Sequence, residues 1–342
     1  MKKKIKKNII FNNINIRHKI PNIEKIKLMV INITKKTITH DIFLNLHKYF
    51  KKKSTIIYNN IQTYKSIIVG YKKNTKNKIK VTLLKQIKKN IWEIKINPAK
   101  KIRINNKIIF YKKKKKILTI QIIDNTNYKC RIAKFINFKD NLKKIINKIG
   151  KYFLPKYISY SKFNDNKYQN FFKNKKEKKK SIILPTENIY FNKKIFLKLK
   201  YKNIKFLKIN SLINKKILKN NYKNILMSEI FKIPYKTIKY IFKKKKNITA
   251  IGINVFKIIE NNIKKNNLNI KPNKWIFNIN NIKTIKNFKI FKNVLTVLHI
   301  NKILFNYIKK IIKKINIYDI YNIAIKNKYK IGLLGDCILI KK

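Results

Sequence analysis

The sequence predicts an α/β fold, with a mixed α/β main domain interrupted by a small antiparallel β-barrel domain. Strand-like and helix-like segments alternate in the first and last parts of the chain. Between those parts, six short β-rich pieces follow one another without a helical segment. The length of 342 residues also exceeds one typical domain. We therefore assign residues 1–65 and 150–342 to the main domain, and residues 66–149 to the inserted barrel.

The first part of the main domain has the order strand, helix, strand. Residues 26–33 (IKLMVINI) and 54–58 (STIIY) are short apolar runs of the kind that forms buried strands. Between them, residues 41–50 (DIFLNLHKYF) carry apolar side chains at helical spacing. This order is typical of an α/β unit.

The inserted domain is rich in short strands. Its pieces are SIIVGY, KIKVTLL, IWEIKI, KIIFYK, ILTIQII and CRIAKF, and Lys-rich or Asn-rich turns separate them at short, regular spacing. Antiparallel meanders of this kind close into small barrels more often than they lie open. We therefore predict a small closed barrel.

After Gly150 the mixed α/β pattern returns. Two strand candidates, 247–254 (NITAIGIN) and 292–300 (KNVLTVLHI), each precede a helical stretch. The Lys-rich segments 173–180 and 243–246 predict solvated loops. The chain ends in KYKIGLLGDCILI, which predicts either a buried strand pair or one strand after a sharp Gly-Asp turn.

The charge balance is extreme. The chain has 88 Lys and Arg against 12 Asp and Glu, and its formal net charge is +76. Such a field attracts polyanions such as nucleic acids. The same composition, heavy in Lys, Asn, Ile, Phe and Tyr, is also produced by AT-rich codons, so charge alone does not select a function.

Several protein classes are not favoured by the sequence. Cys130 and Cys337 are far apart and belong to no CxxC pair, so neither a disulfide framework nor a zinc site is predicted. No apolar run approaches the roughly 20 residues that cross a bilayer. The basic N-terminus lacks the apolar core and cleavage site of a signal peptide. We expect a cytoplasmic protein that does not enter a membrane.

No Walker loop, GxGxxG, HExxH or CxxC motif appears, but a series of shorter matches to one family occurs in order along the chain. The matches are His40 with Phe43, Asn59-Asn60, Trp92-Glu93, Leu154-Pro155 with Tyr157, Tyr168-Gln169, Pro185-Thr186, Ser228-Glu229, Gly252 to Glu260, Thr296 with His299, and Gly335-Asp336. Their order and spacing from about residue 20 to 340 resemble those of the S-adenosylmethionine:tRNA ribosyltransferase-isomerases, a bacterial family of queuosine biosynthesis.

The resemblance implies a specific reaction. The ribosyl moiety of S-adenosylmethionine is transferred and isomerised onto 7-aminomethyl-7-deazaguanine in tRNA, which gives epoxyqueuosine and releases adenine and methionine. S-adenosylmethionine is the substrate and its sulfonium is the electron sink, so the resemblance implies no cofactor and no metal. The implied partners are tRNA and S-adenosylmethionine, and we expect a monomer.

Such a reaction needs a base for the proton next to the sulfonium, an acid for the departing adenine, and donors that hold the ribose hydroxyls. The candidate catalytic residues are His299 and Glu229. An imidazole titrates near neutral pH, and His299 lies at the end of a predicted strand, where α/β sheets place ligand-binding residues. The alternatives are a structural histidine and a surface ion pair. The candidate substrate-binding residues are Asn59, Pro185, Thr186, Gly252, Lys257 and Asp336.

Some positions depart from the family motifs. Residues 187–190 (Glu-Asn-Ile-Tyr) replace A-G-L-H, Met227 replaces a histidine, and Lys257 stands in the place of an arginine. Most lost residues are polar or glycine, the types that active sites need. An alternative function is therefore a family member that binds tRNA without catalysis. A basic ribosomal or RNA-packaging protein would explain the charge but not the ordered matches.

Overall fold

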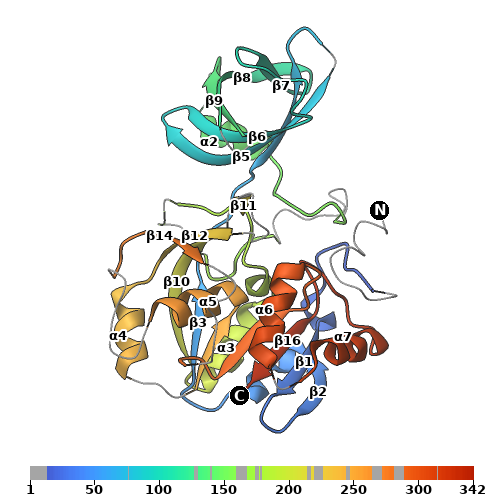
Figure 1. Cartoon of the computed structure of the whole chain (residues 1–342), viewed down its shortest axis with the longest axis vertical. Coiled ribbons are helices and arrows are strands. Elements are labelled where there is room, and N and C mark those ends of the chain that lie inside the picture. Colours follow the sequence, from blue (N-terminus) through green and yellow to red (C-terminus); the bar gives the residue numbers. More distant parts are fainter. Residues whose placement is uncertain are drawn as a thin grey trace.

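The structure, a computed structural model, has a closed β-barrel standing above a larger α/β domain (Figure 1). The predicted fold class is confirmed, whereas the domain limits at 65/66 and 149/150 stay a prediction. The structure describes residues 14–75, 77–126, 130–138, 141–158, 168–173, 177, 179–213, 217–218, 226–243, 247–263, 272–280, 289–313 and 315–342.

The main domain is built on a mixed sheet, to which ten of the described strands belong. Their order is β11-β12-β10-β3-β13-β15-β16-β1-β2, and β14 pairs with β12. Neighbours among β10, β3, β13 and β15 pair in parallel, so the carboxyl ends of these four strands meet at one edge. The strands are β1 (Lys27–Asn32), β2 (Thr37–Ile42), β3 (Thr55–Asn59), β10 (Lys205–Leu212), β11 (Ile217–Leu218), β12 (Leu226–Lys232), β13 (Ile248–Ile251), β14 (Ile276–Asn280), β15 (Asn293–Val297) and β16 (Cys337–Lys341).

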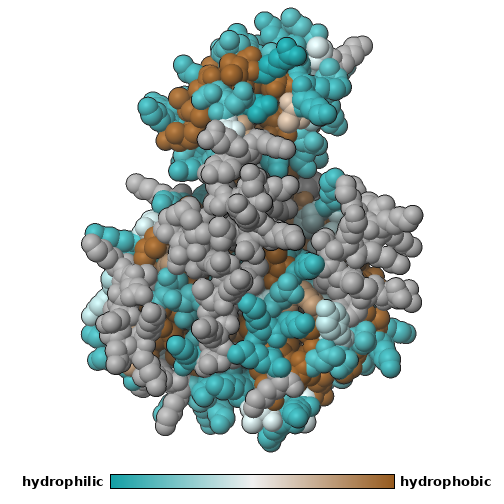
Figure 2. Space-filling model, viewed as in Figure 1, coloured by the Kyte–Doolittle hydropathy of each residue, from teal (hydrophilic) through white to brown (hydrophobic). Residues whose placement is uncertain are grey.

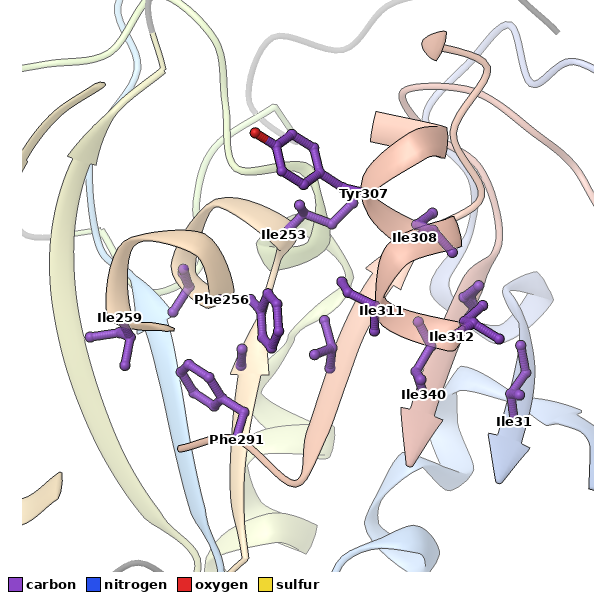
Figure 3. Close-up of a cluster of buried hydrophobic side chains, with 14 of the residues drawn as sticks. Ile31, Ile253, Phe256, Ile259, Phe291, Tyr307, Ile308, Ile311, Ile312 and Ile340 are labelled. Carbon is purple, nitrogen blue, oxygen red and sulfur yellow. The ribbon is translucent and has the colours of Figure 1, made fainter. Parts of the chain in front are cut away.

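Helices cover both faces of this sheet, because alternate residues of its strands point to opposite sides. Ala250 and Val294 face one core, and their neighbours Ile251 and Leu295 face the other. The first core packs against α4 (Tyr235–Lys243), α5 (Ile253–Asn262), α6 (Lys302–Ile312) and α7 (Ile317–Lys326), and Figure 3 shows part of it. The second core packs against η1 (Ile23–Lys25), η2 (Phe43–Tyr49), η4 (Thr186–Tyr190) and α3 (Lys193–Tyr201).

The barrel closes in the order β4-β5-β6-β9-β8-β7, with antiparallel neighbours throughout. Closure leaves these strands without open edges. Helix α2 (Leu142–Ile149) follows the last strand and buries Ile145 and Ile146 in the barrel core. The strands are β4 (Ile67–Lys72), β5 (Lys78–Lys88), β6 (Ile91–Asn97), β7 (Lys107–Lys112), β8 (Lys115–Asn125) and β9 (Arg131–Ile136), which are the six predicted pieces.

Two local predictions need correction. The helix expected over 41–50 is a 3₁₀ helix, η2, and an unpredicted strand, β2, precedes it. Strand β2 has the sequence TITHDI and none of its residues is buried, so it lacks the apolar run that marks the neighbouring strand. At the C-terminus the structure has one strand after the Gly-Asp turn. The predicted loops at 173–180 and 243–246 fall largely outside the described residues.

In the face that Figure 2 shows, the described residues are largely hydrophilic, with hydrophobic patches on the barrel and on the main domain. Within the described part of the chain, no helix is long and apolar enough to cross a bilayer.

Candidate active site

A pocket lies at the edge of the sheet where the parallel strands end. Asn59 ends β3, Gly252 follows β13, His299 follows β15, and the segment 183–187 closes the side. Ligand sites of α/β sheets lie at this edge. The cavity measures about 80 Å³, whereas pockets that enclose a drug-sized ligand hold about 300–1,000 Å³. The cavity formed by the described residues is therefore too small to enclose a whole ligand of that size.

Glu187 and His299 are the titratable residues of the pocket wall, and the buried Thr296 connects them. The Thr296 hydroxyl donates to Glu187 Oε1 at 2.9 Å and lies 3.1 Å from His299 Nε2. A hydroxyl has one hydrogen, so the imidazole must donate from Nε2 to Thr296 Oγ1. His299 Nε2 lies 3.9 Å from Glu187 Oε1. One hydroxyl thus joins an acid to an imidazole and sets the tautomer of the imidazole.

Tyr321 of α7 holds the backbone of His299 in place. The His299 N–H donates to the Tyr321 hydroxyl at 3.1 Å, and that hydroxyl donates to the His299 carbonyl oxygen at 3.0 Å. Tyr321 and His299 are both buried, so these bonds exchange little with water. The backbone that carries the imidazole is therefore held in place, although His299 lies beyond the end of β15.

Burial sets the protonation of the two titratable groups. It lowers the pKa of His299 to about 3, so the imidazole is neutral at pH 7. It also raises the pKa of Glu187, against the opposing effect of hydrogen bonds that include the one from Thr296. A carboxyl group with a raised pKa is a stronger base when ionised and a usable acid when protonated. The site can therefore accept and return a proton.

The neutral state of His299 makes stability depend on pH. Its pKa is about 3 in the fold, against an ordinary 6.5, so below pH 6.5 the unfolded chain binds the proton more readily. The contribution is complete above that pH and is lost as the pH falls, by up to about 1.4 kcal/mol per pH unit. Denaturant unfolding at pH 7.5 and pH 5 should show a smaller loss of stability for His299→Gln than for the natural protein. Equal losses would contradict this prediction.

Position 252 requires glycine because of its backbone conformation and because little space is left for a side chain. Its φ is +94°, which side-chain-bearing residues rarely adopt, and a Cβ there would lie 3.2 Å from Glu187 Oε2. It is also the residue before the first turn of α5, whose free N–H groups favour a nearby negative charge. The backbone at position 252 therefore approaches the carboxylate as closely as glycine allows.

Gly252→Ala is expected to lower both stability and turnover. A strained backbone costs about 1–3 kcal/mol, and the added methyl group would displace the Glu187 carboxylate. Denaturant unfolding and initial rates measure the two effects. Gly332→Ala is the matched control, because Gly332 also has positive φ (+129°) but faces Tyr157. Gly332→Ala should lose stability while keeping most turnover. An equal loss of turnover in both variants would refute the idea that contact between residue 252 and Glu187 matters for turnover.

The other predicted residues of the pocket wall have structural bonds as well. The Asn59 amide joins β3 to β10 by donating to the Ser211 carbonyl oxygen at 2.9 Å and accepting from the Ser211 N–H at 3.0 Å. Pro185 precedes η4 and Thr186 begins it, and both line the pocket next to Glu187. The structure thus brings Asn59, Pro185, Thr186, Gly252 and His299 to one pocket.

Lys257, Asp336 and Glu229 are not among the residues that line the pocket. Lys257 is buried on α5, with its ammonium group 4.5 Å from the centre of the Tyr307 ring. Asp336 is buried and pairs with Arg17. Glu229 lies in β12 opposite Asn278, and its side chain falls outside the described residues.

Glu187 is the residue that sequence reasoning missed, because it stands where the motif comparison found a departure from A-G-L-H. A signal was present. The chain has only 12 acids, and this one directly follows Pro185-Thr186, a matched motif. Its hydrogen-bond partner, Thr296, was matched but was given no role.

Other features of the described residues supply no comparable chemistry. Among them, no group of three or more His, Cys, Asp or Glu side chains is placed to hold a metal ion. A larger hollow of about 640 Å³ lies over the turn between α6 and α7, and Lys, Asn and Ile side chains line it. No acid or histidine is among its lining residues, so that hollow offers no acid–base pair.

Comparisons with known proteins identify the family of this chain. Residues 13–340 match the family of queuosine biosynthesis proteins. The S-adenosylmethionine:tRNA ribosyltransferase-isomerase of Cytophaga hutchinsonii is 28% identical over 265 residues, which are 73% of this chain and 74% of that protein. The enzyme of the same name from Flavobacterium psychrophilum is 26% identical over 338 residues, covering 93% and 94%. A crystal structure of a Thermotoga maritima S-adenosylmethionine tRNA ribosyltransferase is 15% identical, with a TM-score of 0.48 and 96% of each chain covered.

Proposed function

The chain belongs to the queuosine biosynthesis protein family, and from this premise we propose that it acts as an S-adenosylmethionine:tRNA ribosyltransferase-isomerase. It moves the ribosyl moiety of S-adenosylmethionine onto 7-aminomethyl-7-deazaguanine in tRNA and isomerises it, which leaves epoxyqueuosine, adenine and methionine. The observation that carries this function is the family match over residues 13–340. Since the proposed substrate is a tRNA, the cytoplasm is the proposed location of the reaction. The monomeric state stays a prediction.

The alternative of tRNA binding without catalysis is not favoured. Relatives that carry the enzyme's name match more than nine-tenths of the chain, as in the 93% covered by the Flavobacterium protein. The inferred loss of catalytic motifs is not supported either, because the departure at residues 187–190 supplies the buried Glu187 of the pocket.

Glu187 is suited to accept the proton next to the sulfonium. S-adenosylmethionine brings a positive charge to a pocket whose buried acid has few charged partners, and the attraction between them is strong where water is excluded. Because burial raises the pKa of Glu187, its carboxylate is a better base than an exposed one. In this proposal Glu187 accepts that proton, and Thr296 holds the accepting group in place.

His299 contributes as a neutral imidazole. Its Nε2–H fixes the Thr296 hydroxyl, and through it the direction of the Glu187 carboxylate. Asn59, Pro185, Thr186 and Gly252 form the wall that holds the ribosyl end of the substrate. Lys257 and Asp336 are assigned structural roles here, since each is buried and has a partner away from the pocket wall.

The test uses purified protein, S-adenosylmethionine and tRNA that carries 7-aminomethyl-7-deazaguanine. We expect release of adenine and methionine together with a matching mass increase on the modified nucleoside. Salt-sensitive tRNA binding without any release would establish the binding-only alternative.

A further inference from the structure

Two lysines share an aromatic ring beside the pocket, and the charge of a third lysine acts on one of them. Lys85 belongs to barrel strand β5, Lys179 to the segment that connects the domains, and Lys232 ends β12 of the main sheet. The ammonium groups of Lys179 and Lys232 lie 4.5 Å and 5.2 Å from the centre of the Trp275 ring. One aromatic ring therefore attracts both cations by cation–π interaction. Figure 1 shows β5 at the barrel end nearest the main domain, and β12 on the side that faces it.

The charges of this lysine cluster are close enough to act on one another. The pKa of Lys179 is lowered first by burial and then by the nearby charges of Lys85 and Lys232, while Glu177 acts in the opposite sense. Glu177 is the acid of the cluster. It accepts from Lys232 Nζ at 2.6 Å and from Asn210 Nδ2 at 3.0 Å. Three lysines and one glutamate leave two positive charges without a matching acid in this set.

A short path of contacts connects the cluster to the pocket. Asn210, which bonds to Glu177, pairs with Lys232 across β10 and β12. The next residue, Ser211, exchanges two hydrogen bonds with Asn59 of the pocket wall. The cluster therefore lies on the same strand ends as the pocket, where a substrate that enters the pocket would continue outward.

We propose that Lys85, Lys179 and Lys232 bind a backbone phosphate of the tRNA next to the nucleotide that is modified. This inference rests on the proposed function, since it takes tRNA as the substrate. Lysine binds phosphate as a point charge, and phosphate contacts position a nucleic acid without reading its sequence. Lysines occur along the whole chain, but Lys179 and Lys232 share the Trp275 ring beside the pocket, and Lys85 adds a charge from the barrel. A phosphate bound by the three lysines would bring the barrel and the main domain into contact with the same RNA strand.

The test measures tRNA affinity as a function of salt for the Lys85→Gln, Lys179→Gln, Lys232→Gln triple variant. Each phosphate charge neutralised contributes about −0.7 to −0.9 to the slope of log K against log salt. We expect a weaker salt dependence and an affinity reduced at least 10-fold near 150 mM salt. Glu177→Gln should change affinity in the opposite direction and tighten tRNA binding, because it removes the one negative charge.

The matched control replaces three exposed lysines at the opposite edge of the sheet with glutamine. These are Lys51, Lys52 and Lys200, which precede the amino ends of β3 and β10. Equal loss of affinity in the two triple variants, or weaker binding by Glu177→Gln, would overturn the proposal. Circular dichroism confirms that each variant is folded. Turnover by the natural protein is assayed separately, so failure of the enzymatic function would be recognised independently of the binding result.

Discussion

Replacing Glu187 with glutamine is expected to reduce turnover by about 10²–10⁴-fold, the usual contribution of a positioned acid or base. Glutamine keeps the size of the side chain and an oxygen that accepts from Thr296. It removes the charge that attracts the sulfonium and the group that takes the proton. Because burial disfavours the ionised form of Glu187, the neutral variant should be at least as stable as the natural protein. Low activity in a well-folded protein is therefore the expected result.

Adenine release under saturating S-adenosylmethionine measures this effect. Glu24→Gln makes the same chemical change at an exposed acid in η1 and should keep full turnover. A Glu187→Gln variant with turnover within threefold of the natural protein would remove Glu187 from the mechanism. His299→Asn should also lose turnover, and the double variant should lose less than the product of the single effects. Groups that act through one shared hydroxyl are not additive.

Much of the fold could be predicted because its signals are local. The six barrel strands are apolar pieces separated by polar turns, and the central strands of the sheet are short buried runs bounded by Asn or Lys. The turns between the strands and helices were harder to predict. This chain has 5 glycines, and among the described residues Asn and Lys take positive φ at turns such as Asn74, Asn90 and Lys113. These residues also fill exposed strand positions, so they mark turns weakly.

The site could be predicted in part because strand ends are visible in a sequence. Asn59, Gly252 and His299 all follow short apolar runs, and all three line the pocket. Glu187 could not be placed in this way, since it lies in a 3₁₀ helix that no parallel strand leads into. Its position depends on packing between segments more than 100 residues apart, as its bond to Thr296 shows. Periodicity carries no information about such contacts.

The second large effect concerns Arg17, one of three arginines in a chain whose other strong bases are lysines. Its guanidinium group pairs with the buried Asp336 carboxylate, which also accepts from the backbone N–H groups of Lys27 and Lys330. Ile16, the residue before Arg17, forms a β-bridge with Ile331. These bonds attach the N-terminal segment to the turn before β16. Leu333 belongs to that turn and lines the pocket. Arg17 therefore supports the pocket from the far end of the chain.

Arg17→Met is expected to destabilise the protein by about 3–5 kcal/mol, because it leaves a buried carboxylate without its cation. The free energy of unfolding in denaturant measures this loss. Asp336→Asn removes the buried charge but keeps an oxygen for only one of the two backbone donors, since the Lys27 N–H donates to Oδ1 and the Lys330 N–H donates to Oδ2. The Arg17→Met, Asp336→Asn double variant should therefore recover part of the stability. A double variant as unstable as the sum of the single effects would show that the two residues act independently. Arg17→Lys tests the geometry, since an ammonium group keeps the charge but lacks the planar fork of guanidinium. In a chain that uses lysine almost everywhere else, a clear loss of stability in Arg17→Lys would show that the shape of the cation, and not only its charge, holds the two ends of the chain together.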